Sequence, residues 1–207
     1  MSVAEAIIFF KNILMNTIFY VCTYGGSGST AFCKHLGQFA KKVYHVHSKM
    51  PPATLKQVDL FNEHFTDVDA DPKNTKCIFL YRDPTEAILS RFELKQHLRN
   101  IECDETITVA QVAQQKKDLY GITDFFYNYL EAPRNYPVLF VKYEALFTSM
   151  DLVHQYLSVP PTLRIEPLVK VETLKESAYE PQLKEIYAPL VAQMQKLPRV
   201  FWSGASS

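Results

Sequence analysis

Short apolar runs alternate with segments of helical periodicity along most of the chain. Three runs rich in β-branched and aromatic residues predict buried strands, at residues 18–21, 77–81 and 137–142. A fourth run, 43–47, alternates apolar and polar residues and predicts a short strand. Because strands that alternate with helices are typical of parallel sheets, the pattern predicts a three-layer α/β fold with a mainly parallel sheet flanked by helices.

Helices are predicted in the segments that connect these strands. One follows the first strand and continues to about Lys42, and Pro84 marks the start of another, since proline is favoured at the first helical position. Thr54 can cap a helix that carries Leu55, Val58, Leu60 and Phe61. Apolar residues at helical spacing predict further helices at 109–130, as one helix or a pair, at 145–157 and at 183–197.

A run of glycine and hydroxyl residues follows the first strand, at Gly25, Gly26, Ser27, Gly28, Ser29 and Thr30. The first N–H groups of a helix have no internal partner and the helix dipole favours negative charge there, so a glycine loop at this junction predicts a phosphate site. A purely structural turn has the same composition, and the loop alone leaves both interpretations open. The G-x-x-x-x-G-K-[ST] spacing is absent, which argues against a nucleoside triphosphatase.

Composition narrows the choice of partners. The chain has 207 residues and 47% hydrophobic content, which predicts a single globular domain over 1–207. Lysine plus arginine and aspartate plus glutamate both number 22, so no global basic charge indicates a nucleic-acid partner, and any anion site must be local.

Cysteine usage and the N-terminus bear on location. The four cysteines have no C-x-x-C spacing, and two of them lie in predicted buried strands, so we expect no disulfide framework and no metal site, as in a cytoplasmic protein. Residues 6–14 are too short and too interrupted to span a membrane. They predict an amphipathic helix packed on the domain, with a membrane-surface anchor as the alternative.

Polar groups follow each predicted strand. They are the glycine loop, the segment 47–49, Arg82 and Tyr143. Because parallel sheets bind ligands beyond the carboxyl ends of their strands, we expect these groups to lie near one another.

Taken together, these segments resemble the sulfotransferase family, whose members transfer a sulfuryl group from 3'-phosphoadenosine 5'-phosphosulfate (PAPS) and release 3'-phosphoadenosine 5'-phosphate. The segment 24–30 is similar to the 5'-phosphosulfate loop of the family, 81–90 to its 3'-phosphate motif, and 141–146 to its V-[RK]-Y-E-D-L strand end. The resemblance covers about residues 18–147 and implies a fold like that of P-loop NTPases.

The resemblance also implies roles for single residues. Arg82 and Ser90, eight positions apart, would hold the 3'-phosphate, and Tyr143 would lie near the adenine. A guanidinium is a rigid fork of donors that suits a phosphate. Each residue also has a structural alternative. Arg82 can form an ion pair with Asp83 or Glu86 instead. Ser90 can be an ordinary helical serine, and Tyr143 can be an aromatic ring that covers the sheet edge.

The candidate general base is His47, because the segment 47–51 resembles the T-H-x-x-P-like segment of the family and imidazole titrates near neutrality. His45 lies on the same side of the strand, so either ring can instead be a hydrogen-bonded structural histidine. Lesser candidates for the base are His64, Glu63 and Asp83.

Two departures from the family bear on catalysis. Many members carry Lys or Arg where this chain has Gly26, and the C-terminal R-K-G phosphate clamp is missing. Lys49 is the nearest cation that can replace the loop lysine, and its alternative role is a solvated charge before a proline turn.

The sequence therefore predicts a PAPS-dependent sulfotransferase that acts on a hydroxyl or amine of a small-molecule or conjugate acceptor. Two other functions remain open: a P-loop nucleotide kinase or NTPase, and a catalytically inactive nucleotide-binding protein of the same fold.

Overall fold

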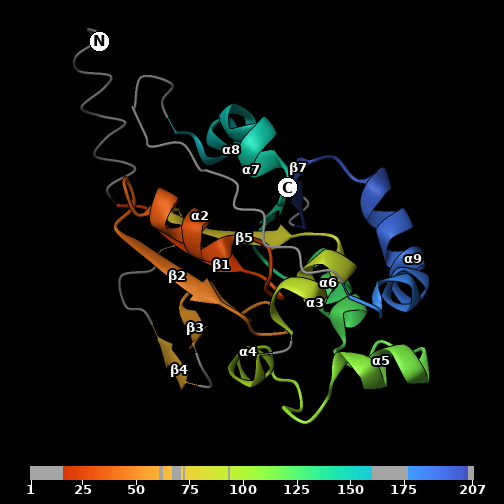
Figure 1. Cartoon of the computed structure of the whole chain (residues 1–207). Helices are drawn as coiled ribbons and strands as arrows, with labels where there is room; N and C mark the ends of the chain where they lie inside the picture. Colours follow the sequence, from red (N-terminus) through yellow and green to blue (C-terminus); the bar gives the residue numbers. More distant parts are fainter. Residues whose placement is uncertain are drawn as a thin grey trace, which may run out of the picture.

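A five-stranded, mostly parallel sheet forms the centre of the fold (Figure 1). The computed structural model describes residues 16–60, 63–66, 71, 73–92, 94–159 and 177–204. In sheet order the strands are β2 (Lys42–Val46), β1 (Ile18–Cys22), β5 (Thr75–Tyr81), β6 (Val138–Lys142) and β7 (Val200–Ser203). The first four are parallel, and β7 pairs with β6 in the antiparallel direction. The predicted α/β class and mainly parallel sheet are confirmed.

Alternate side chains of the central strands enter two separate cores. Along β1, Tyr20 packs into one core with Phe79, while Phe19 packs into the other with Ile78. Every residue of β1 is buried, as expected for a strand covered on both faces. Cys22 of β1 is paired in register with Phe79, so the strands end near the same edge of the sheet.

Helices cover both faces of the sheet, and Figure 1 shows α8 on the side away from α4 and α5. One core receives α2 (Ser29–Leu36), α7 (Ala145–Thr148) and α8 (Met150–Leu157). The other core receives α3 (Pro84–Arg91), α4 (Lys95–Asn100), α5 (Val109–Gln115), α6 (Ile122–Glu131) and α9 (Glu180–Lys196). In the described ranges, no helix is long and apolar enough to cross a membrane.

The helix predicted after Thr54 is wrong. The chain instead forms an antiparallel hairpin of β3 (Gln57–Leu60) and β4 (Glu63–Thr66), with Val58 opposite Phe65. Polar and apolar residues alternate in β3, and this period of two fits a strand better than a helix.

Other boundaries differ less. The helix after the glycine loop ends at Leu36 rather than Lys42, because the N–H groups of Gln38 and Phe39 turn back to His35 and Leu36. The segment 109–130 forms a pair of helices, α5 and α6, and the predicted helix 145–157 is divided into α7 and α8. The expected helix at 6–14 and most of the stretch that opens at Pro160 lie outside the described residues.

Candidate functional site

The glycine loop lies between the end of β1 and the start of α2, at the edge where the parallel strands end. The side chain of Tyr24 anchors the start of the loop to β5, since its hydroxyl donates to the carbonyl of Arg82 and accepts from the Arg82 N–H at 2.9 Å. Gly28 then precedes the first turn of α2, which has no side-chain cap. The first N–H groups of α2 are therefore directed at the loop.

Gly26 is the point of closest approach between the loop and α3. Its φ is +66°, and a Cβ there would lie 2.6 Å from the carbonyl oxygen of Ala87 and 2.8 Å from the Oγ of Ser90. Both features require glycine, because a side chain would be strained and would collide with the helix backbone. A lysine or arginine at position 26, which the sequence resemblance leads us to expect, does not fit the loop as it stands.

Arg82 reaches the same point from the end of β5. Its Nη1 donates to the carbonyl of Gly26 at 3.1 Å, its Nε pairs with Glu86 at 2.6 Å, and its guanidinium lies 4.4 Å from the ring centre of Tyr143. The side chain is only 8% exposed, so this is no ordinary surface ion pair. Arg82 thus forms the ion pair with Glu86 that the sequence offered as an alternative, and it also lies beside the loop as predicted.

Helix α3 delivers Ser90 to the other side of Gly26. Asp83 accepts from the N–H groups of Thr85 and Glu86, and Pro84 takes the first helical position, so the helix begins directly after Arg82. Ser90 lies two turns later, and its hydroxyl donates to the Ala87 carbonyl at 3.1 Å. Arg82 and Ser90 are thus brought together at the loop, as their spacing predicts.

Tyr143 follows β6 and covers the far end of the loop. It is 5% exposed, and a Cβ at Gly28 would lie 2.8 Å from its ring. The ring therefore touches both the loop and the guanidinium of Arg82. This position is also the one expected if Tyr143 only covers the edge of the sheet.

The hydroxyl residues of the loop differ in what they contact. Ser27 is fully buried and bonds to the hydroxyl of Thr23 at 2.5 Å, so it holds the loop from inside. Ser29 bonds to Nε2 of His45 at 2.7 Å, while Thr30 is exposed on the first turn of α2. Thr30 is therefore the most open of the three hydroxyls, while Ser29 is buried against His45.

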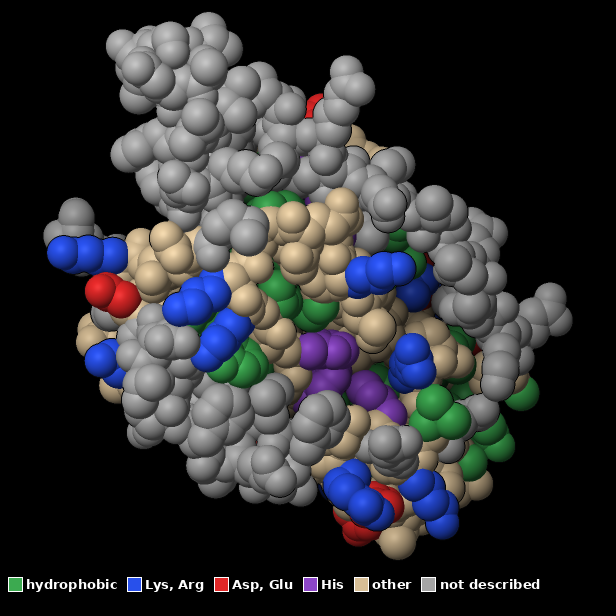
Figure 2. Space-filling model, turned by 90° about the vertical axis from the view of Figure 1, so that its left-hand side faces the viewer, with side chains coloured by type: hydrophobic (Ala, Val, Ile, Leu, Met, Phe, Trp, Pro, Cys, Tyr) green, Lys and Arg blue, Asp and Glu red, His purple; other side chains and the backbone are tan. Residues whose placement is uncertain are grey.

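Three histidines gather beside the loop. The ring centres of His45 and His47 lie 4.5 Å apart, and those of His47 and His97 lie 5.8 Å apart. Figure 2 shows histidine side chains near the centre of one face of the molecule, with Lys and Arg side chains around them. Burial, the neighbouring rings and Arg91 lower the pKa of His45 and of His97 to about 4, and burial also lowers the pKa of His47.

His47 has the tautomer that a general base needs. Its Nδ1 lies 2.8 Å from the carbonyl oxygen of Thr23, and because a carbonyl only accepts, Nδ1 carries the proton. In the neutral ring, Nε2 then keeps its lone pair. His47 can accept a proton on Nε2 while Thr23 fixes its orientation.

The structure does not bring the other predicted groups to the loop. Lys49 extends to the start of α6, where a Cβ at Gly121 would lie 3.4 Å from its Nζ, and its charge acts on Cys103. Asp83 is engaged as the cap of α3. Glu63 and His64 lie on β4, in the hairpin rather than at the carboxyl edge of the main sheet.

Two residues that act on the loop or on its histidines were not predicted. The Nε2 of His97 donates to the carbonyl of Tyr24 at 3.2 Å, and Arg91 is the charge that acts on all three rings. The only sequence signal for Arg91 was its place directly after Ser90, and His97 had none.

Comparison with known proteins identifies no relative: no family model, curated protein or solved structure matches this chain. In the part of the chain that the structure describes, no group of three or more His, Cys, Asp or Glu side chains is arranged to hold a metal ion. The four cysteines are free.

Proposed function

We propose that this protein is a sulfotransferase that transfers a sulfuryl group from PAPS to a hydroxyl or amine of an acceptor. One observation carries the proposal: Arg82 and Ser90 meet at Gly26, so a guanidinium and a hydroxyl lie against the glycine loop. An ordinary strand-to-helix turn needs no buried arginine at its edge. This arrangement suits a nucleotide that carries phosphates on both sides of its ribose.

The residues present fit such a nucleotide by their chemistry. Arg82 supplies donors for a 3'-phosphate, and the Ser90 hydroxyl would supply another by turning from the Ala87 carbonyl to the ligand. The loop with the first turn of α2 supplies backbone N–H groups for the 5'-phosphosulfate. Tyr143, a largely buried ring between Arg82 and Gly28, would border the adenine. We expect Gly25, Gly28 and Ser29 to lie along the 5' side.

The protein's own part in the reaction is to position the reactants and to move one proton. PAPS supplies the activated sulfuryl group. His47 would accept the proton of the acceptor on Nε2, because Thr23 holds its Nδ1–H. As in phosphoryl transfer, positioning and electrostatic stabilisation should carry most of the rate. The free cysteines support a reducing location such as the cytoplasm.

One observation favours a second candidate, a protein that binds the nucleotide without transferring sulfate. The loop has no lysine, and position 26 leaves no room for one. This candidate shares every nucleotide contact with the first, and only a transfer assay separates the two.

Calorimetric titration with 3'-phosphoadenosine 5'-phosphate, ADP, and ATP with magnesium tests the proposal. We expect the 3'-phosphorylated nucleotide to bind best, and Arg82→Ala to weaken it by about 10–100-fold, since charge-assisted hydrogen bonds contribute about 1.5–3 kcal/mol. ADP should be affected much less. Arg99→Ala is the matched control, because Arg99 is exposed and pairs with Glu105 at the surface.

Two results would overturn the proposal. Tight binding of ATP with magnesium but not of the 3'-phosphorylated nucleotide would indicate a nucleotide kinase or NTPase. Equal weakening of ADP and the 3'-phosphorylated nucleotide by Arg82→Ala would show that Arg82 does not bind the 3'-phosphate.

A further inference from the structure

Two imidazoles touch the two ends of the glycine loop. The ring of His97 lies directly against Gly25 and bonds to the neighbouring Tyr24 carbonyl. The ring of His45 bonds to the hydroxyl of Ser29, the first residue of α2. A titratable imidazole therefore lies at each end of the loop.

The cations predicted for this loop are directed elsewhere. Lys49 lies at the start of α6, and position 26 has no space for a long side chain. The guanidinium of Arg82 is engaged by the Gly26 carbonyl and by Glu86. An anion held inside the loop would meet His45 and His97 as its nearest protonatable neighbours.

We propose that His45 and His97 supply the positive charge of this loop by taking up a proton from solvent when a phosphate or sulfate group binds. The inference rests on the proposed function, because it concerns the same loop, but it applies to any tetrahedral oxyanion. Protonation makes the charge of the site conditional on the ligand, whereas a lysine would carry its charge permanently.

The surroundings of the two rings favour this coupling. The charged or titratable groups that act on them are Arg91 from α3, His47 after β2 and, for His45, His97 from α4, and each repels a proton. With burial, they keep the pKa of both rings at about 4, so the rings are neutral without ligand. An anion nearby reverses the balance, because opposite charge stabilises the imidazolium.

The hydrogen bonds leave a position for the extra proton on each ring. His97 donates Nε2–H to Tyr24, so the proton would be added at Nδ1. When His45 is protonated, its Nε2–H donates to the Oγ of Ser29 and leaves the serine proton to bond the ligand. His47 lies between the two rings, and their charge disfavours its protonation, so it stays a neutral base.

Calorimetry in buffers of different ionisation enthalpy tests the inference, because it counts the protons taken up on binding. The probes are inorganic sulfate and 3'-phosphoadenosine 5'-phosphate. Sulfate stays fully ionised at neutral pH, so any proton taken up with it goes to the protein, whereas nucleotide phosphates titrate near pH 6 themselves. We expect about one proton per bound anion at neutral pH, and affinity that falls up to about tenfold per pH unit as pH rises.

Two variants and one spectroscopic measurement identify the groups that take up the proton. His45→Gln with His97→Gln should abolish the uptake and flatten the pH dependence, while His154→Gln, which alters a histidine on α8, should change neither. NMR titration of the imidazole carbons in the unaltered protein should show His45 or His97 becoming charged when sulfate is added. This measurement decides the question even if the double variant fails to fold.

The outcomes separate this inference from the proposed function. Binding of the 3'-phosphorylated nucleotide and of sulfate without proton uptake overturns the inference and leaves the sulfotransferase proposal intact. Sulfate binding with proton uptake, but no preference for the 3'-phosphorylated nucleotide over ADP, supports the inference and overturns the sulfotransferase proposal. Failure of both probes to bind overturns both.

Discussion

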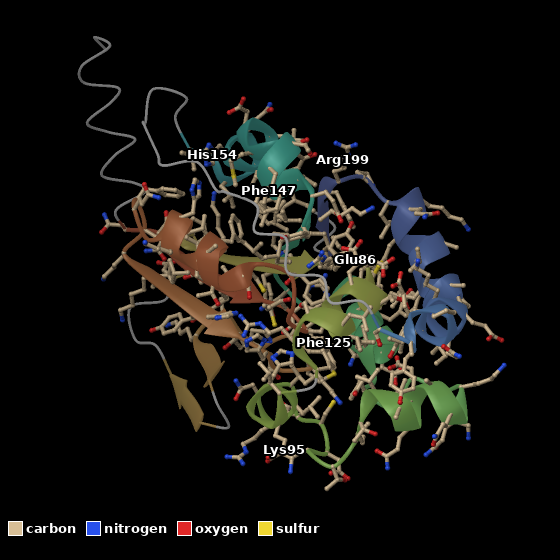
Figure 3. The ribbon with its side chains drawn as sticks, in the orientation of Figure 1. Glu86, Lys95, Phe125, Phe147, His154 and Arg199 are labelled. Carbon is tan, nitrogen blue, oxygen red and sulfur yellow. The ribbon has the colours of Figure 1, made fainter. Side chains whose placement is uncertain are left out.

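A histidine contacts each end of helix α2, and the surroundings of these two contacts differ. At its N-terminal end, His45 bonds to Ser29 beside the glycine loop. At its C-terminal end, His35 bonds to His154 of α8, with the two Nε2 atoms 2.9 Å apart and the rings stacked at 5.2 Å. Figure 3 shows His154 at the outer edge of the fold, apart from Glu86, which pairs with the arginine beside the loop.

The difference lies in what each histidine has as its partner. His35 and His154 bond to each other, so the contact joins two helices and is complete without a ligand. The helix dipole also favours positive charge at that end, where Lys34 lies in the last turn. At the other end the dipole favours an anion and opposes imidazolium. The same residue type therefore joins two helices at one end, whereas at the other end we propose that it takes up charge when an anion binds.

The largest expected effect is on the rate of sulfuryl transfer, and it comes from comparing a histidine beside the glycine loop with one beside the C-terminal end of α2. His47→Gln should lower sulfuryl transfer by about 10²–10⁴-fold, the usual contribution of a general base, while nucleotide affinity stays nearly unchanged. His154→Gln should leave transfer unchanged and reduce only thermal stability, by about 1 kcal/mol for one lost hydrogen bond. Turnover with a panel of hydroxyl and amine acceptors measures the first effect. Unchanged turnover in His47→Gln would remove His47 as the base.

The glycines at the two ends form a second matched pair. Gly26→Ala should weaken nucleotide binding by about 10–100-fold, because its φ is +66° and a Cβ would meet the backbone of Ala87. Gly37→Ala has ordinary helical φ and only 3.4 Å contacts, so it should leave binding unchanged and stabilise the fold by about 0.4–1 kcal/mol. Calorimetry and thermal unfolding of both variants measure the difference. Normal nucleotide affinity in Gly26→Ala would mean that the loop is not the binding site.

Sequence reasoning predicted the elements whose signal is local. Strands β1, β5 and β6 are unbroken apolar runs because they are buried on both faces. Strand β7 was missed, since it has four residues and lies at the edge, with Trp202 partly exposed. The hairpin β3–β4 was missed because the apolar residues at 55, 58, 60 and 61 were interpreted as those of a helix capped by Thr54.

The site follows the same rule. Arg82 and Ser90 were predicted because one strand end and one helix fix their separation. His97 contacts Tyr24 across 73 residues, through a helix whose position depends on packing, so no spacing could reveal it. Lys49 was near the loop in the chain but extends to α6 in the fold. Closeness along the sequence did not predict closeness in the fold where the segment between two groups was irregular.

The remaining expected effect concerns stability in acid. Because the pKa of His45 and of His97 falls from its ordinary value to about 4 on folding, the unfolded chain binds more protons between about pH 4 and 6.5. The free energy of unfolding should therefore decrease as pH falls through this range, by about 1–2 kcal/mol per ring after solvent screening, or about 2–4 °C in Tm for each kcal/mol.

The histidines at the other end of α2 provide the comparison for this measurement. The pKa of His154 is also lowered, by burial and by His35, but Asp151 acts in the opposite direction. His45→Gln with His97→Gln should thus flatten the dependence of Tm on pH more than His154→Gln does. Added sulfate should flatten it as well in the unaltered protein, because the bound anion makes the protonated rings favourable in the folded state. Equal slopes in both variants would show that the two ends of α2 respond to acid alike, and the distinction between them would fail.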